Sequence, residues 1–313
     1  MSSDQGALYV IAGVTAAGKT ELALSWAEQY GAEILSCDSV SIYKGLDIGS
    51  AKPDLEQRNR VPHHGIDLFE LSHACDVGQF SSHAFKVVDE IKKRGNPVLV
   101  VGGSGFYLQS FFQPVVDDIV VSQEVRNEVQ SFYEKRGLPA LVERLRHLNP
   151  GGLNGLDYLN PRRVTRALER CLVSGKSLEK LKAEFNAKPK PFPGFCKKVI
   201  WLDRENSDLE KRIEQRTQKM LDDGLVDETA RLLKKGLLDN GPASNSVGYR
   251  EAISCLQGIL SPKDLKVEVM SATRKLVSKQ RKWFRKHLPP GSRYMLEKKC
   301  AVQPDGIIWH TGT

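Results

Sequence analysis

One segment of eight residues, GVTAAGKT at positions 13–20, most constrains the fold of this 313-residue chain. It fits the pattern G-x-x-x-x-G-K-[ST] at every position. An apolar run at 7–12 precedes it and a helical pattern at 19–30 follows it. A phosphate-binding loop needs this context, because loop amides and a helix N-terminus must converge on one anion. The segment therefore predicts an α/β fold, with a parallel sheet core like that of P-loop NTPases.

The residue types in this loop also predict what it holds. Its glycines let backbone amides approach phosphate oxygens closely. Lys19 supplies a positive charge to a terminal phosphate, and Thr20 offers a hydroxyl to Mg²⁺, the expected cofactor. The motif predicts a polyphosphate but does not distinguish ATP from a ligand with a pyrophosphate group. The predicted phosphate-binding residues are Gly13, Val14, Thr15, Ala16, Ala17, Gly18, Lys19 and Thr20.

Strand and helix patterns divide the chain into a core and an insertion. Helical patterns alone occupy about 117–193, and the proline-rich stretch 188–193 closes that region. We therefore predict an α/β core at 1–116 and 196–313, with a helical C-terminal region, and an inserted helical domain at 117–195. The predicted strands are 7–12, 32–36, 97–101 and 198–202. The predicted helices are 19–30, 80–94, 123–136, 138–148, 161–172, 178–185, 209–220, 226–233, 249–257, 265–269 and 272–287.

The net charge of +8 is distributed unevenly along the chain. Residues 1–110 carry 9 Lys and Arg against 13 Asp and Glu, whereas residues 111–313 carry 37 against 25. Seven basic and no acidic residues lie in 274–287. This asymmetry indicates that one part of the chain binds a small ligand and another part faces a polyanion. A basic helix that is merely exposed to solvent would give the same charge distribution.

Several classes of protein are disfavoured by composition and spacing. No apolar run approaches about 18 residues, so we expect no membrane-spanning helix. The first six residues resemble no leader peptide. The six cysteines are at least 25 positions apart, which argues against zinc-ligand spacing and favours reduced thiols in the cytoplasm. We interpret the adjacent His63 and His64 as residues at a strand start and not as metal ligands.

Two polar features follow predicted strands and should share the edge of the sheet that carries the P-loop. Asp38 follows the strand 32–36, where it could be a Mg²⁺ ligand, a general base or an N-cap. The strand 97–101 ends in Gly-Gly-Ser-Gly, without the Asp that many NTPases place there. That absence argues against a standard ATPase, and the missing last glycine of G-x-S-x-G argues against a serine hydrolase. We expect the Ser104 hydroxyl and neighbouring amides to lie near a phosphate.

Seven segments in fixed order resemble the tRNA dimethylallyltransferase family, also called tRNA isopentenyltransferases. The likeness is to the bacterial type, because the chain lacks the C-terminal zinc-finger cysteines and histidines of eukaryotic members. The segments extend over nearly the whole chain. They are GVTAAGKT, CDSVSIYKGLDIGSAKP (37–53), HHGIDL (63–68), VVGGSGFYL (100–108), NPRRVTRALE (160–169), SVGYREAI (246–253) and ATRKLVSKQRKWFRK (272–286).

This resemblance implies a reaction and three catalytic residues. The dimethylallyl group of dimethylallyl diphosphate would pass to the exocyclic amine of the adenine 3′-adjacent to the anticodon, giving N6-isopentenyladenine in tRNA. The P-loop would hold the donor's diphosphate instead of hydrolysing ATP. Asp38 matches the family's base, and Arg216 matches an arginine that neutralises the leaving group. Ser104 stands where the family usually has Thr.

The resemblance also implies the tRNA contacts, expected to be with the anticodon stem-loop. A monomer is the default expectation for the oligomeric state. Position 41 departs from the family, which usually has Gln there, and a serine hydroxyl cannot read an adenine edge bidentately. We expect the aromatic residues Trp283 and Phe284 to belong to the core. The implied contacts are Asp38, Ser39, Val40, Ser41, Ser104, Arg126, Arg162, Arg163, Arg166, Gly248, Tyr249, Arg250, Gln280 and Arg281.

Three other functions compete with this interpretation. A P-loop kinase of small molecules would not need the long basic part of the chain. A nucleic-acid-binding ATPase without transferase chemistry is disfavoured by the missing Asp after the strand 97–101. An isopentenyltransferase acting on free adenylate shares the chemistry, but it should need neither the insertion nor the basic C-terminal helix.

Overall fold

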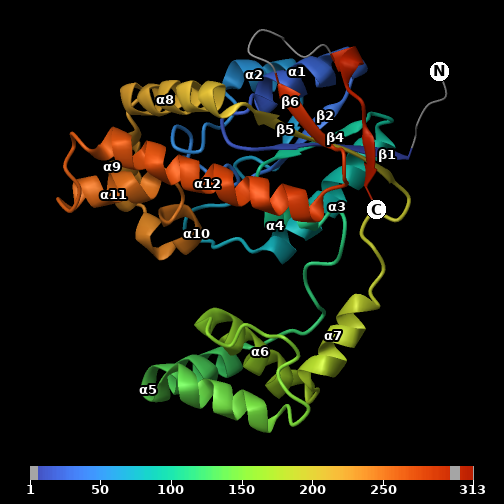
Figure 1. The fold of residues 1–313 in the computed structure, drawn as a ribbon, viewed down its shortest axis with the longest axis vertical. Coiled ribbons are helices and arrows are strands. Elements are labelled where there is room, and N and C mark those ends of the chain that lie inside the picture. Colours follow the sequence, from blue (N-terminus) through green and yellow to red (C-terminus); the bar gives the residue numbers. More distant parts are fainter. Residues whose placement is uncertain (1–5, 297–303, 313) are drawn as a thin grey trace. The chain divides into compact units, whose positions relative to one another are not determined.

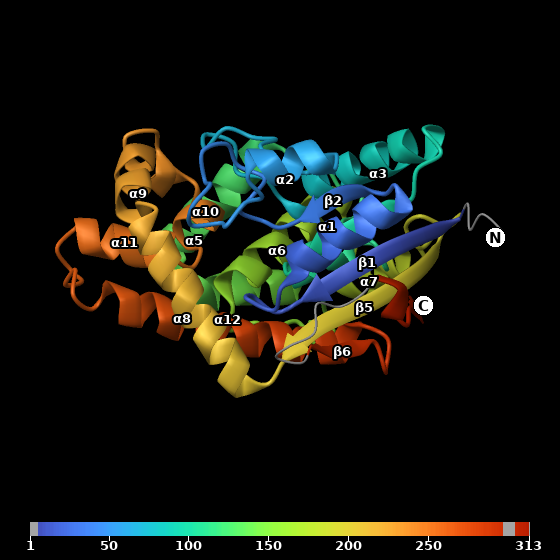
Figure 2. The same cartoon turned by 90° about the horizontal axis from the view of Figure 1, so that it is seen from above.

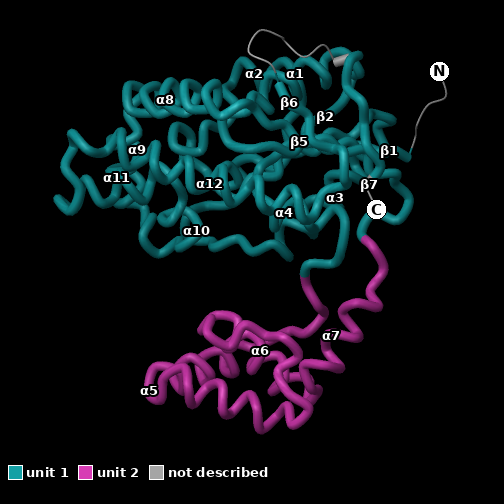
Figure 3. The backbone as a smooth tube through the Cα atoms, in the orientation of Figure 1, with its two compact units in different colours: residues 1–115, 191–313 teal, residues 116–190 magenta. Residues whose placement is uncertain are grey.

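The computed structural model describes residues 6–296 and 304–312, and it divides into two compact units (Figure 3). Unit 1 comprises 1–115 and 191–313, and unit 2 comprises 116–190. The predicted boundaries, after residues 116 and 195, lie one and five residues from these. Five cysteines are free thiols, whereas Cys300 lies outside the described residues. None of the described helices is long and apolar enough to cross a membrane.

Unit 1 is built on a seven-stranded sheet of order β3-β2-β4-β1-β5-β6, with β7 paired to β5 (Figure 1). Neighbouring strands run parallel except β5 and β7. The predicted α/β fold with a parallel sheet is therefore confirmed. The strands are β1 (Ala7–Gly13), β2 (Glu33–Cys37), β3 (His63–His64), β4 (Val98–Gly102), β5 (Cys196–Arg204), β6 (Arg293–Leu296) and β7 (His310–Gly312).

Helices cover the sheet, and five more α-helices follow β5 in the described part of the chain. The crossover from β1 to β2, through α1, runs towards the β3 edge of the sheet, and the crossover from β3 to β4, through α3, runs the opposite way. Because both crossovers are right-handed, α1 and α3 lie on opposite faces of the sheet. Figure 2 shows β1 beside β5, with α1 along β1. The helices are α1 (Lys19–Tyr30), α2 (Leu55–Arg60), α3 (Val77–Lys93), α4 (Gly105–Gln109), α8 (Asn206–Asp222), α9 (Leu225–Leu233), α10 (Gly241–Ser244), α11 (Tyr249–Leu256) and α12 (Leu265–His287), with 3-10 turns η1 (Leu237–Asp239) and η2 (Pro304–Gly306).

The central strands bring their carboxyl ends unusually close together. In β1 only Tyr9 is partly exposed, as expected of a strand covered on both faces. A Cβ on Gly102, the last residue of β4, would lie 2.0 Å from the carbonyl oxygen of Cys37 at the end of β2. Only glycine allows this approach. The segments that follow β2 and β4 therefore begin side by side, next to the P-loop at the end of β1.

Unit 2 is helical and has its own core. It consists of α5 (Gln123–His147), α6 (Pro161–Ser174) and α7 (Leu178–Asn186). Gly137, with φ 75° and ψ 177°, kinks α5 where the sequence predicted a break between two helices. The buried residues of this core are Val129, Leu141, Val142, Leu145, Val164, Ala167, Leu168, Cys171 and Leu181.

The structure also differs from the sequence prediction in several short elements. Helices α2, α4 and α10 and strands β6 and β7 were not predicted, because six or fewer residues carry little periodicity. The capping box of Asp54 and Gln57 was a usable signal for α2. The stretches 265–269 and 272–287 form one helix, α12. His63 and His64 form β3, as expected.

Candidate active site at the carboxyl edge of the sheet

The P-loop is held open by arginines that bind its outward-facing carbonyls. Ala16 has a left-handed backbone, with φ 65°, and its carbonyl accepts a 2.8 Å hydrogen bond from Arg212 Nε. The next carbonyl, of Ala17, accepts a 2.8 Å hydrogen bond from Arg204 Nε. Lys19 Nζ donates to the carbonyls of Gly13 and Val14, both at 3.0 Å. With these contacts in place, the amides at the N-terminus of α1 are the part of the loop suited to an anion.

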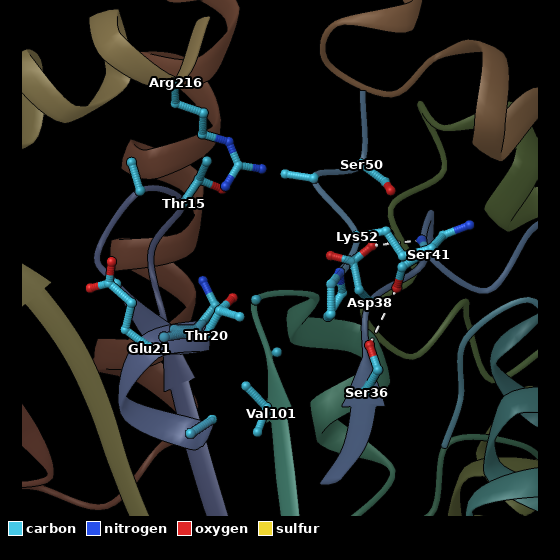
Figure 4. Close-up of a pocket in the computed structure, with 18 of the residues that line it drawn as sticks. Thr15, Thr20, Glu21, Ser36, Asp38, Ser41, Ser50, Lys52, Val101 and Arg216 are labelled. Carbon is cyan, nitrogen blue, oxygen red and sulfur yellow. Dashed lines mark hydrogen bonds between the residues drawn. The ribbon is translucent and has the colours of Figure 1, made fainter. Parts of the chain in front are cut away.

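A cavity of about 610 Å³, which we call the P-loop cavity, opens beside this loop. Figure 4 shows Thr15, Thr20 and Arg216 on one side of it and Asp38, Ser41 and Ser50 on the other. Gly13, Val14 and Ala17 do not line it, and Val14 and Ala17 are fully buried. Basic, hydroxyl and carboxylate groups therefore face one another across a space suited to a small phosphorylated ligand.

Asp38 is fixed by the turn that follows β2. Its Oδ1 accepts hydrogen bonds from the amides of Val40 and Ser41, at 2.8 and 3.1 Å. The described residues offer no hydrogen-bond partner to Oδ2, so this oxygen can accept a proton from a ligand. Capping the turn and acting as a base are therefore compatible roles for one carboxylate.

Ser104 lies beside the turn that carries Asp38. Its Oγ accepts a 3.1 Å hydrogen bond from the amide of Ser39 and lies 3.3 Å from Ser39 Oγ. The side chain lines a second cavity and not the P-loop cavity. Its contact with a phosphate stays a prediction. In this structure the hydroxyl ties the turn after β4 to the turn that carries Asp38.

The second cavity, which we call the aromatic cavity, measures about 800 Å³ and adjoins the first. Phe284 is fully buried as expected, whereas Trp283 is only partly buried and lies against Gly105. The aromatic side chains in the lining are Phe106, Tyr107, Trp283 and Phe284. Six residues line both cavities and so mark their junction: Thr15, Asp38, Ser50, Gly103, Arg216 and Gln280.

The electrostatics of the junction make the Lys19 charge sensitive to pH. Burial, and then the nearby Arg216, lower the pKa of Lys19 to about 8, while Asp38 opposes the shift. The ammonium is therefore charged at neutral pH and loses its proton as the pH rises through about 8. Burial likewise lowers the pKa of Arg216, again against Asp38.

A pH dependence of anion binding follows from this pKa. We expect the affinity for inorganic pyrophosphate, measured by calorimetry, to fall by up to about tenfold per unit above pH 8, because the ligand loses one cationic partner. Lys19→Arg keeps its charge throughout. The pH profile of pyrophosphate affinity for Lys19→Arg is therefore the control, because it contains the titration of pyrophosphate itself but not that of residue 19. Parallel profiles for the two proteins would contradict the assignment.

The residues present fit a magnesium ion that is held mainly by its substrate. Thr20 lines the P-loop cavity, and the described residues form no cluster of three or more His, Cys, Asp or Glu side chains able to hold a metal. Asp203, the last residue but one of β5, is fully buried and bonded to Arg281 and Arg293. Mg²⁺ commonly takes one or two protein ligands and completes its shell with phosphate oxygens and water. Thr20 would be the protein ligand in such an arrangement.

Unit 2 gathers three of its four predicted tRNA contacts. Arg126, Arg162 and Arg166 are exposed and line one pocket of about 410 Å³ between α5 and α6. Arg163 does not line it and pairs with Asp157 at 3.1 Å. The pocket is therefore a basic, solvent-facing site on this unit.

The segment at the start of α11 is mainly structural. The side chain of Tyr249 is fully buried and donates a 2.6 Å hydrogen bond to Glu228. The same carboxylate accepts from the amides of Ile48 and Gly49, which precede Ser50. Tyr249 thus positions the loop beside the cavities. Gly248 is also buried, with its amide bonded to Glu251, so of the predicted contacts in this segment only Arg250 is exposed.

Two predicted contacts on α12 are also engaged inside the protein. Arg281 donates to both oxygens of Asp203, to Asn206 Oδ1 and to the carbonyl of Arg204. Gln280 is nearly buried and bonds to the P-loop. Neither side chain is free in this structure, so their tRNA contacts stay predictions. Other basic side chains of α12 are exposed and have no ion-pair partner among the described residues: Lys275, Lys279, Lys282, Arg285 and Lys286.

The sequence prediction missed a basic row on α8. Arg212, Gln215 and Lys219 line the P-loop cavity together with the predicted Arg216. Their spacing of three and four residues places them on one helix face. That spacing was visible in the sequence, but nothing local indicated that this face of α8 turns towards the P-loop.

Comparison with known proteins identifies the family of this chain. Residues 41–287 match the IPP transferase family. The tRNA dimethylallyltransferase of Opitutus terrae is 49% identical over 292 residues, covering 93% of this chain and 94% of the relative. That of Geobacter metallireducens is 34% identical over 280 residues, covering 89% of each.

Solved structures lead to the same family. The tRNA isopentenylpyrophosphate transferase of Bacillus halodurans is 29% identical, with a TM-score of 0.66, and covers 93% of this chain and 89% of its own. A eukaryotic dimethylallyltransferase, solved acting on tRNA, is 25% identical, with a TM-score of 0.79, over 93% of this chain and 73% of its own. The P-loop, the Asp38 turn and these likenesses together place the chain in the IPP transferase family.

Proposed function

We propose that this protein transfers a dimethylallyl group from dimethylallyl diphosphate to the exocyclic amine of the adenine 3′-adjacent to the anticodon in tRNA, giving N6-isopentenyladenine. The observation that carries the proposal is the junction of the two cavities, where Asp38 and Arg216 line both. A transferase needs its base and its leaving-group cation at the point where two substrates meet. We also infer a monomer that acts in the cytoplasm, where its tRNA substrate is found.

The P-loop cavity suits the donor. Lys19 and Arg216 line this cavity beside the N-terminus of α1, where a diphosphate would meet positive charge. When the bond between C1 and the diphosphate oxygen breaks, negative charge develops on the leaving group. Preorganised donors in the protein stabilise this developing charge more than water does. A bound Mg²⁺, with Thr20 among its ligands, would add further charge stabilisation to the diphosphate.

The aromatic cavity suits the acceptor. An adenine amine inside a stack is out of reach, so the base must be flipped into a pocket, and single-stranded loops permit this most readily. Trp283 and Phe106 offer aromatic surface to such a base. As N6 forms its bond to C1, Asp38 Oδ2 accepts the proton that N6 releases, and pyrophosphate leaves with the electrons of the broken bond.

One experiment separates this function from its competitors. The protein is incubated with Mg²⁺ and labelled dimethylallyl diphosphate, with either unmodified tRNA or AMP as acceptor. We expect label in tRNA alone. Transfer only to AMP would indicate the enzyme that acts on free adenylate. Phosphoryl transfer from ATP to a small molecule would indicate a kinase, and either result contradicts the proposal.

The exposed basic face of α12 leads to a prediction about salt dependence. We expect the double variant Lys282→Ala/Arg285→Ala to weaken tRNA binding several-fold and to reduce the slope of log Kd against log[salt] by about 1 to 2, because two phosphate contacts are lost. Filter binding at 50 to 200 mM salt measures both quantities. The matched control is Lys86→Ala/Lys93→Ala on the exposed side of α3, in the acidic first third of the chain. A double α12 variant with the wild-type slope would place the tRNA elsewhere.

A further inference from the structure

The side chain of Gln280 connects two segments of the active site that are far apart in sequence. It lies on α12, beside α4 (Figure 1), and is only 9% exposed. Its Oε1 accepts a 2.9 Å hydrogen bond from the amide of Thr15 in the P-loop. Its Nε2 donates a 3.1 Å hydrogen bond to the carbonyl of Gly103 in the turn after β4. One buried amide group therefore links the P-loop to the turn that carries Ser104.

This link lies at the junction of the P-loop cavity and the aromatic cavity. Thr15, Gly103 and Gln280 line both of them. A Cβ on Gly103 would come within 2.7 Å of Gln280 Nε2 and 3.6 Å of Lys19 Nζ. The turn is therefore packed closely against Gln280 and lies near Lys19.

The neighbouring residue on the same helix behaves differently. Lys279 is exposed and lines the aromatic cavity alone. Its ammonium has no ion-pair partner among the described residues, whereas both polar ends of Gln280 bond within the protein. Lys279 thus presents a charge to the aromatic cavity, whereas the adjacent Gln280 forms a link inside the protein.

We propose that Gln280 is a positioning residue, which holds the P-loop at a fixed separation from the Gly103 turn and so aligns the donor's diphosphate with Asp38 and Ser104. The role rests on the proposed function, since it concerns the donor of that reaction. It also replaces the tRNA contact that the sequence implied for this residue. Small displacements of a bound reactant can cost about 100-fold in rate, so such a link matters for catalysis.

The test compares Gln280→Met with Lys279→Met. Methionine preserves the length of glutamine but leaves the Thr15 amide and the Gly103 carbonyl without partners, a loss of about 1 to 3 kcal/mol, or 5- to 150-fold. We expect Gln280→Met to raise the Kd of inorganic pyrophosphate and the KM of dimethylallyl diphosphate about tenfold or more, with the tRNA Kd within twofold of wild type. Lys279→Met should raise the tRNA Kd and leave the pyrophosphate Kd and the KM of dimethylallyl diphosphate unchanged.

A second variant guards against misfolding. Thermal unfolding is measured for each protein, and Gln280→Glu replaces Gln280→Met if the latter does not fold. Glutamate keeps an acceptor for Thr15, but it loses the donor to Gly103 and adds negative charge near Lys19. We expect it, too, to weaken pyrophosphate binding while tRNA affinity is retained.

The possible results separate the inference from the proposed function. An unchanged pyrophosphate Kd with a raised tRNA Kd would make Gln280 an RNA contact and overturn the inference. Two unchanged constants would overturn it as well. A wild-type protein that binds pyrophosphate without prenylating tRNA would refute the proposed function alone, because the binding measurements on Gln280 need no turnover.

Discussion

Asp38→Asn is expected to lower the kcat of prenyl transfer by about 10²- to 10⁴-fold, the usual contribution of a positioned general base. Asparagine retains an oxygen that accepts from the amides of Val40 and Ser41, so the turn after β2 is preserved. What it lacks is an oxygen that can take a proton from N6. Single-turnover measurements with saturating donor and tRNA give the chemical rate directly.

Binding measurements complete the test of Asp38. The tRNA Kd and the pyrophosphate Kd of Asp38→Asn should stay within about threefold of wild type, because neither substrate is held chiefly by this carboxylate. Asp38→Ala also removes the cap of the turn, and comparing the two variants separates basicity from geometry. A rate for Asp38→Ala within tenfold of wild type would mean that another group accepts the proton.

Arg216→Gln is expected to show the second-largest effect, a fall in kcat of about 10²- to 10³-fold, comparable to the loss of one oxyanion donor. Arg216 lines both cavities opposite Asp38 (Figure 4), where charge develops on the leaving diphosphate. Its contribution should appear more in kcat than in KM, since the leaving group gains charge during the reaction. The kcat of Arg216→Lys should lie between those of wild type and Arg216→Gln, because lysine keeps the positive charge but lacks the planar guanidinium that can donate two parallel hydrogen bonds.

A residue on the same helix provides the control for Arg216. Lys211 is exposed and does not line either cavity, so Lys211→Gln should leave both kinetic constants unchanged. Equal losses in Lys211→Gln and Arg216→Gln would point to a general electrostatic effect of α8. A loss confined to the KM of the donor would make Arg216 a binding group without a specific role in bond cleavage.

The elements that the sequence predicted well depend on short-range physics. The P-loop, β1 and α1 follow from a glycine pattern between an apolar run and a helical period, and α1 has the predicted bounds, 19–30. Asp38 was placed on the correct edge because parallel strands end at one edge. The break at Gly137 followed from a glycine within a helical pattern.

Tertiary structure decided which polar groups are available to ligands. Arg281 and Lys282 are adjacent basic residues, yet one is bonded to the buried Asp203 and the other is exposed. Tyr249 lies in a segment that resembles a tRNA contact, but its hydroxyl bonds to Glu228 in the core. Charge and residue type could not distinguish these cases, because each depends on what another part of the chain brings to it.

The sequence alone determined that a loop with the phosphate-binding pattern joins β1 to α1, since eight consecutive residues and their flanks suffice to predict it. Only the tertiary structure decided which distant segments meet where the two cavities join. Thr15 and Gln280 are 265 residues apart and share a hydrogen bond, and Ser104 reaches Ser39 across the edge of the sheet. Such contacts form when the chain returns to the P-loop, and their energies depend on burial and alignment that no local pattern encodes.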